Sequence, residues 1–117
     1  MQSLLLDDAL ELIQREAEAV PYERVYYALR RMRVNHVYEP TVETMRLCLA
    51  LQKRGLRVTV PLIGALRKRT DTAAVSTLHT LGDKKCLTLI RGSNRLNLTW
   101  IVSPEFLRQY DGASANE

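Results

Sequence analysis

The chain has 117 residues, 46% of them apolar, and a net charge of only +4. We expect this length to allow one compact domain with its own hydrophobic core and to leave little room for a second. Because no apolar run approaches the roughly 20 residues of a membrane-spanning helix, and Leu4–Leu6 is followed at once by two aspartates, we expect neither a membrane segment nor a secretory signal.

Two helices are predicted for the first 38 residues. Apolar side chains recur at helical spacing over residues 4–19, and Pro21 opens a second helix that ends near Arg33. Because these helices carry more apolar surface than a small domain needs to cover, residues 1–38 predict a helical hairpin that forms a homodimer. The alternative is that both helices fold back on the domain. The side chains expected at the dimer interface are Leu4, Leu5, Leu6, Leu10, Leu12, Ile13, Tyr22, Tyr26 and Tyr27.

A third helix is predicted from about Thr41 to Arg54, with Gly55 at the position that ends it. Its apolar residues occupy two faces, which indicates a central helix packed by neighbours on both sides. A short extended segment, Arg57–Thr59, follows it. Thr59 can cap the next helix, which has Pro61 in its first turn.

The stretch that follows predicts two short helices, a tight turn and a β-hairpin. The helices are Leu62–Arg69 and Ala73–Leu81 around the turn Thr70–Thr72, and the strands are Cys86–Arg91 and Leu96–Val102, joined by Gly92–Arg95. This order is that of a winged helix-turn-helix. We therefore expect a mainly α fold with a small β-hairpin over residues 39–110, preceded by an N-terminal helical extension. After Pro104, a closing turn of helix is predicted, and residues 111–117 are expected to be disordered.

The basic residues are concentrated in one part of the chain. Residues 45–103 contain eleven Lys or Arg against two Asp, a net charge of +9, whereas residues 1–44 and 104–117 are net acidic. A block this basic favours a surface that binds a polyanion, and the alternative is an ordinary solvated face. Together with the helix-turn-helix order, the charge favours double-stranded DNA as the partner.

The second helix of the turn, at about residues 72–81, is the predicted recognition helix. Its apolar stripe of Val75, Leu78 and Leu81 should anchor it on the core. Small and hydroxyl side chains on its other face allow close approach to DNA and contacts with phosphates or thymine methyls. Between Thr70 and Asp83, however, there is no Arg, Lys, Asn or Gln for bidentate base reading.

Cations flank this helix rather than lie on it. They end the preceding helix and follow the recognition helix, where the duplex backbone would pass. The predicted wing, residues 91–95, has an arginine at each end that suits a narrow minor groove, with a solvated hairpin tip as the alternative. The expected DNA-binding residues are Arg67, Lys68, Arg69, Thr72, Ala73, Ser76, Thr77, Thr80, Lys84, Lys85, Arg91, Ser93, Asn94 and Arg95.

The runs Ala74–Leu81, Cys86–Gly92 and Arg95–Thr99 carry a family resemblance. Over residues 41–102, the chain resembles winged-helix transcription regulators of bacteria and archaea, above all the arsenical-repressor and multiple-antibiotic-resistance types. The resemblance implies that the matching helix enters the major groove, that the hairpin forms the wing, and that the protein is a homodimer. Those families usually place a glycine just before the first hairpin strand, whereas this chain has Asp83-Lys84-Lys85.

These features predict a sequence-selective transcription regulator that binds double-stranded DNA as a homodimer, in the cytoplasm and associated with the nucleoid. The alternative is a winged-helix adaptor between proteins, or a subunit of a nucleic-acid-processing complex for replication or partition. We expect no enzyme activity, because no nucleophile motif, phosphate-binding loop or carboxylate pair is present. We expect no cofactor or metal, because the two histidines and two cysteines form no ligand-spaced pair. Cys48 and Cys86 are expected to be small core residues in a reducing compartment.

Overall fold

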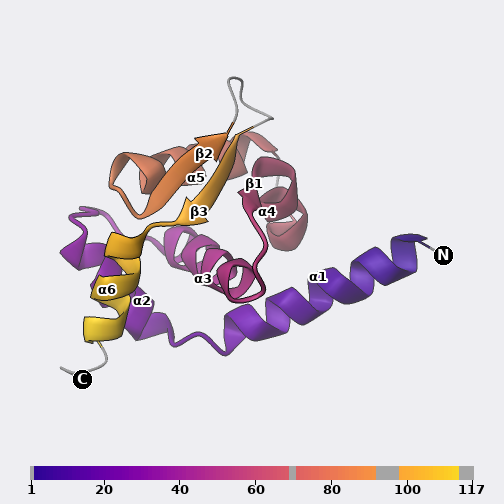
Figure 1. The fold of residues 1–117 in the computed structure, drawn as a ribbon, viewed down its shortest axis with the longest axis horizontal. Coiled ribbons are helices and arrows are strands. Elements are labelled where there is room, and N and C mark those ends of the chain that lie inside the picture. The colour runs from indigo at the N-terminus through magenta and orange to yellow at the C-terminus, as the bar shows by residue number, and fades with distance from the viewer. Residues whose placement is uncertain (1, 69–70, 92–97, 114–117) are drawn as a thin grey trace.

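The computed structural model describes residues 2–68, 71–91 and 98–113, with side chains placed for 8–68, 73–90 and 98–112. The described part is mainly helical with a small antiparallel sheet, so the coarse fold expectation is confirmed (Figure 1). It contains no helix long and apolar enough to cross a bilayer. The elements are α1 (Gln2–Glu18), α2 (Tyr22–Arg31), α3 (Glu39–Lys53), β1 (Val58–Thr59), α4 (Val60–Arg67), α5 (Asp71–Asp83), β2 (Leu87–Arg91), β3 (Thr99–Val102) and α6 (Pro104–Ala113).

Helix α3 lies at the centre of the molecule, with α1, α2, α4 and the sheet around it (Figure 1). Apolar side chains on both of its faces are buried, which confirms the two-sided pattern seen in the sequence. Met45 and Leu51 are fully buried, and Leu47 and Leu49 nearly so. Because α3 contacts elements from every part of the chain, it organises one continuous core.

The N-terminal helices belong to that same core. Ile13 of α1 and Leu29 of α2 are buried in one cluster with Met45 of α3 and Phe106 of α6. Figure 1 shows the first turns of α1 reaching away from the body, while α2 packs beside α6. The expected boundary between residues 38 and 39 therefore runs through a shared core, and a chain starting at Glu39 would lose part of it.

The sheet has three strands in the order β1-β3-β2, all antiparallel. The segment expected only to be extended supplies β1, which pairs Val58 with Trp100 and Thr59 with Thr99. Strand β2 pairs Leu87 with Val102, and its register shifts between Leu89 and Arg91. The two long strands thus form the expected hairpin, and β1 adds a third strand beside β3. Strand β2 is left at one edge.

Local capping explains where the helices start and stop differently from the prediction. Helix α4 begins at Val60 rather than Leu62, because the Thr59 hydroxyl accepts the Leu62 N–H at 3.3 Å and so caps the helix there. It ends at Arg67 rather than Arg69, because Lys68 turns into the left-handed region with φ 56°. Helix α5 starts at Asp71, so Asp71 and Thr72 are helical and not part of the predicted turn.

Helix α5 also runs past its predicted end at Leu81 and stops at Asp83. The Lys85 N–H bonds the Gly82 carbonyl at 3.1 Å and the Cys86 N–H bonds the Leu81 carbonyl at 2.9 Å. This pair of bonds is a Schellman motif, which requires a left-handed residue at its turn. Lys85, with φ 66°, fills that position, which is most often a glycine at helix ends. Because Cys86 is held by this motif, β2 starts one residue later than predicted.

Helix α6 is longer than the predicted closing turn. The Arg24 guanidinium on α2 donates from Nε to the Tyr110 carbonyl at 2.9 Å and lies 4.1 Å from the centre of the Tyr110 ring. Its Nη2 is 3.6 Å from the Asp111 carboxylate. These contacts hold the end of α6 against α2, so the expected disorder from residue 111 is wrong for residues 111–113. Residues 114–117 lie outside the described residues.

Candidate nucleic-acid interface

Helix α5, the predicted recognition helix, has one buried and one exposed face. Val75, Leu78 and Leu81 are buried against the core, which confirms the predicted anchoring stripe. At spacings of three and four residues, the side chains of Ser76, His79, Thr80 and Asp83 are exposed instead. Helix α4 packs against α5. The exposed face of α5 is therefore narrow, polar and built of small side chains, apart from His79.

The hydroxyl groups on this face are not equivalent. Thr77 Oγ1 donates to the Ala73 carbonyl at 3.2 Å, and Thr80 Oγ1 donates to the Ser76 carbonyl at 3.1 Å. Because their hydroxyl protons are donated to helix carbonyls, both oxygens can only accept a hydrogen bond from a ligand. Ser76 has no such bond among the described residues, and its exposed hydroxyl is free to donate to a phosphate oxygen. His79 packs edge-on against Trp100, with 6.1 Å between ring centres.

A hollow of about 500 Å³ separates α5 from the segment that leads into α3. Ser76, Thr77, Thr80 and Lys84 line it from the side of α5. From the other side it is lined by Val34, Asn35, His36, Tyr38, Pro40 and Thr41. Sequence reasoning did not place this segment beside α5, because nothing in the local pattern signals a contact between positions some 40 residues apart.

Arg67 has a different environment from that of a free phosphate ligand. Its Nη1 donates to the Pro40 carbonyl at 2.9 Å and to the Thr44 hydroxyl. Thr44 is fully buried in α3 and itself donates to the Pro40 carbonyl at 2.8 Å. Arg67 is half-buried and joins α4 to the first turn of α3. Its guanidinium thus makes internal hydrogen bonds that hold the two helices together.

Three other predicted cations are free of such contacts. Lys68, Lys84 and Lys85 have no ion-pair or side-chain hydrogen-bond partner among the described residues. Lys68 and Lys85 are exposed at the ends of α4 and α5, and Lys84 lines the hollow. In the described ranges, the non-glycine residues with left-handed backbone are Arg33, Lys68 and Lys85. All three carry a positive charge. A residue with a Cβ occupies that region at a cost of about 1 kcal/mol relative to glycine.

Several predicted site residues lie outside the described part. Arg69, Ser93, Asn94 and Arg95 are among the residues that the structure does not describe. Thr72 lies in the first turn of α5 and Arg91 at the end of β2, with their side chains also outside the description. Ala73 is half-buried on α5. The predicted wing at residues 91–95 thus remains a sequence prediction.

The remaining cations of the basic block divide into two groups. Arg46 donates to the Val20 and Glu18 carbonyls at 3.0 and 2.7 Å and pairs with Glu43, so it secures the turn between α1 and α2. Arg54 donates two hydrogen bonds, of 2.8 and 2.6 Å, to Glu16 and lowers the pKa of that carboxyl. Lys53 and Arg57, by contrast, are exposed at the far end of α3 from the hollow. Part of the basic block therefore consists of cations that make contacts within the fold.

The cysteines are unsuited to chemistry at this surface. Burial raises the pKa of the Cys86 thiol to about 12 and that of Cys48 further still. Both are free thiols in the core, as expected from their apolar surroundings in the sequence. Over the described ranges, no three His, Cys, Asp or Glu side chains gather closely enough to hold a metal ion. Comparison of the chain with known protein families, with curated proteins and with solved structures gave no match.

Proposed function

We propose that the chain is a winged-helix transcription regulator that binds double-stranded DNA with the exposed face of α5 and the cations at its borders. The observation that carries this proposal is the exposure and the left-handed backbone of Lys68 and Lys85. Both are exposed, unpaired among the described residues and held in a backbone conformation that glycine would adopt at lower cost. Strain of this kind is retained where the side chain has a use, and a cation beside a polar helix suits a phosphate.

The topology supports the winged-helix part of the proposal. Helix α3, strand β1, helices α4 and α5, and the hairpin of β2 and β3 follow in the winged-helix order, with β1 paired to β3. In such an arrangement, the second helix of the turn fits the major groove, which is about 12 Å wide. Ser76 and Thr80 present small side chains there, so the α5 backbone can approach the duplex closely.

A binding assay with a matched control tests the proposal. We expect fluorescence anisotropy with a random-sequence duplex to show binding that weakens steeply between about 50 and 200 mM salt. Lys68→Gly with Lys85→Gly should weaken binding and reduce the salt slope by about 1.8, at roughly 0.9 per phosphate contact. The control, Lys53→Gln with Arg57→Gln, removes the same charge at the far end of α3 and should leave the slope nearly unchanged. If both double variants lose affinity and salt slope equally, the chain binds the duplex only by general charge attraction.

The proposal includes a homodimer formed through the N-terminal helices. Leu12 on α1 is 45% exposed, and Tyr22 and Tyr27 on α2 are also exposed. Ile13, by contrast, is buried within the chain, and Tyr26 is partly buried. The side chains of Leu4–Leu6 lie outside the description. A two-fold dimer would set two α5 helices about 34 Å apart, one turn of DNA, and would match a palindromic site. A protein of this kind would act in the cytoplasm, on the nucleoid.

One observation favours the second candidate function, an adaptor between proteins within a nucleic-acid-processing complex. Leu89 and Ile90 are 53% and 40% exposed on β2, an edge strand that packs against α5. An exposed apolar pair on an open strand edge is a site where another chain can pair. Absence of salt-dependent duplex binding in the assay above would favour this candidate over the regulator.

A further inference from the structure

The segment between α2 and α3 borders the same surface as α5. We propose that residues 33–38 form the second half of the DNA-binding surface, and that Asn35 and Tyr38 read base sequence there, a task for which α5 lacks side chains. This inference rests on the proposed function and goes beyond it, because it assigns sequence discrimination to a segment outside the helix-turn-helix.

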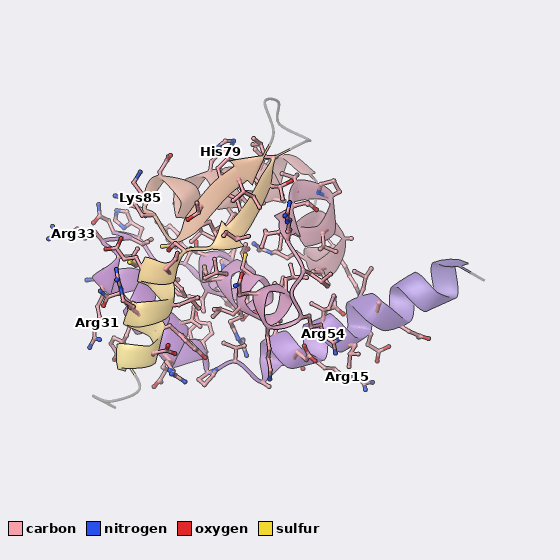
Figure 2. All side chains as sticks on the ribbon, viewed as in Figure 1. Arg15, Arg31, Arg33, Arg54, His79 and Lys85 are labelled. Atoms are coloured by element: carbon pink, nitrogen blue, oxygen red, sulfur yellow. The ribbon has the colours of Figure 1, made fainter. Side chains whose placement is uncertain are left out.

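The position of the segment is the first support. The hollow of about 500 Å³ is lined on one side by Asn35, His36 and Tyr38. On the other side it is lined by Ser76, Thr77 and Thr80 of α5 and by Lys84, which follows that helix. Figure 2 shows Arg33 and Lys85 on the same edge of the molecule, and their neighbours Val34 and Lys84 line the hollow together. A duplex lying on Ser76 and Thr80 would therefore meet this segment beside the second half of α5.

Hydrogen bonds hold the backbone of the segment at both ends. Arg33 follows the C-cap of α2 with φ 67°, and the Val34 N–H bonds the Leu29 carbonyl at 3.1 Å. Arg30 Nη1 donates to the Asn35 carbonyl at 3.1 Å, and the Tyr38 carbonyl accepts the Val42 N–H at 3.1 Å at the start of α3. Val34 is buried, which anchors the segment on the core. Because the backbone is already held, binding costs little backbone entropy, and the side chains on it can discriminate between ligands.

The side chains themselves are available and suited to bases. Asn35 is exposed, and its amide has no hydrogen-bond partner among the described residues. Such an amide can pair in two places with the N6 and N7 edge of adenine in the major groove. Tyr38 is 65% exposed and stacks on His36, with 6.1 Å between ring centres and 19° between planes. The face of the Tyr38 ring, which lines the same hollow as Asn35, suits an apolar contact with a thymine methyl group.

Arg33 gives the segment its own phosphate contact. It is exposed, unpaired among the described residues and left-handed, so it shares all three properties of Lys68 and Lys85. The three positions that carry this backbone cost lie just beyond the ends of α2, α4 and α5. We expect the preferred DNA to carry A·T pairs at the edge of the footprint, next to the bases below the second half of α5.

Selection from randomised duplexes, followed by affinity measurements on the selected and a scrambled duplex, tests the inference. The parent chain should prefer the selected duplex, and Asn35→Ala and Tyr38→Ala should each lose about 5- to 100-fold of that preference with an unchanged salt slope. The control is Leu56→Ala, which removes an exposed apolar side chain just beyond the far end of α3 from the hollow and should keep the preference. All three variants should melt close to the parent, because the side chains removed are exposed.

The outcomes separate the two proposals. A parent chain that binds no duplex overturns the proposed function and this inference with it. A parent chain that binds duplexes with a preference retained by Asn35→Ala and Tyr38→Ala overturns only the assignment to this segment. Duplex binding without any preference does the same. Tighter binding to the single strands of the selected duplex would overturn the groove contact and assign the His36–Tyr38 stack to unpaired bases.

Discussion

Arg67 and Lys68 are neighbours in sequence, yet the structure gives opposite expectations for their removal. Arg67→Ala deletes the charged donor that the Pro40 carbonyl and the buried Thr44 hydroxyl share. Hydrogen bonds to a charged group contribute about 1.5–3 kcal/mol, and this one is half-buried, so we expect a loss of about 2 kcal/mol. With an unfolding entropy of about 2.1 cal/mol/K per residue, that loss lowers the melting temperature by about 8 °C.

Lys68→Gly changes stability in the other direction. Glycine relieves the left-handed backbone at φ 56°, which should add up to about 1 kcal/mol and raise the melting temperature by up to about 4 °C. The favourable position of a cation at a helix C-terminus offsets part of this gain. Lys68→Gly should nonetheless weaken duplex binding, whereas Arg67→Ala should keep the salt slope of the parent, because its guanidinium is engaged inside the chain.

Thermal unfolding and anisotropy on the same preparations check both expectations. Arg57→Ala serves as the control, because Arg57 is exposed and has no partner among the described residues. That change should alter stability by less than about 0.5 kcal/mol. An Arg67→Ala variant that melts with the control, and binds DNA with a reduced salt slope, would refute the structural role and return Arg67 to the phosphate contacts.

Three further expectations follow from the described contacts. Because Arg54 lowers the pKa of Glu16, their ion pair stabilises the fold above the unfolded pKa of about 4.3, and this stabilisation is lost as the pH falls through the lower folded pKa. The difference in melting temperature between the parent and Glu16→Gln should therefore be present at pH 7 and vanish in acid. A difference that persists at pH 2 would contradict this. Cys48 and Cys86 should react with a disulfide reagent at pH 8 only as fast as the chain opens, with urea accelerating the reaction in step with unfolding, and rapid labelling of the native chain would argue against their burial. Leu12→Glu should convert a dimer to a monomer in sedimentation equilibrium without unfolding the chain, and an unchanged mass would exclude α1 from the interface.

The helical order could be predicted from the sequence because its signals are local. The apolar stripe of Val75, Leu78 and Leu81, the cap at Thr59 and the stop at Gly55 each depend on a few neighbouring residues. The errors in helix ends also have a local cause. Glycine in a sequence often indicates a helix end, because it adopts left-handed backbone easily, whereas lysine gives no such indication. The helix ends at Lys68 and Lys85 therefore could not be predicted from the sequence.

The surroundings of the cations could not be predicted in the same way. Arg46, Arg54 and Arg67 count toward the basic block in the sequence, but their hydrogen bonds reach residues 23 to 38 positions away. The same limit hid Asn35 and Tyr38, which lie in a part of the chain that is acidic on average and reach α5 only through the packing of α2 and α3. Net charge over a window describes affinity for polyanions but not which side chains remain free.

A single added carboxylate on α5 tests the central claim most directly. Ser76 is exposed in the middle of the proposed contact face, so Ser76→Glu should place a negative charge against the duplex and abolish measurable binding at 100 mM salt. Gln109→Glu adds the same charge on α6, away from α5, and should bind within about twofold of the parent. If Ser76→Glu, folded to the same melting temperature, binds duplex DNA as tightly as Gln109→Glu does, the exposed face of α5 is not the DNA-binding surface.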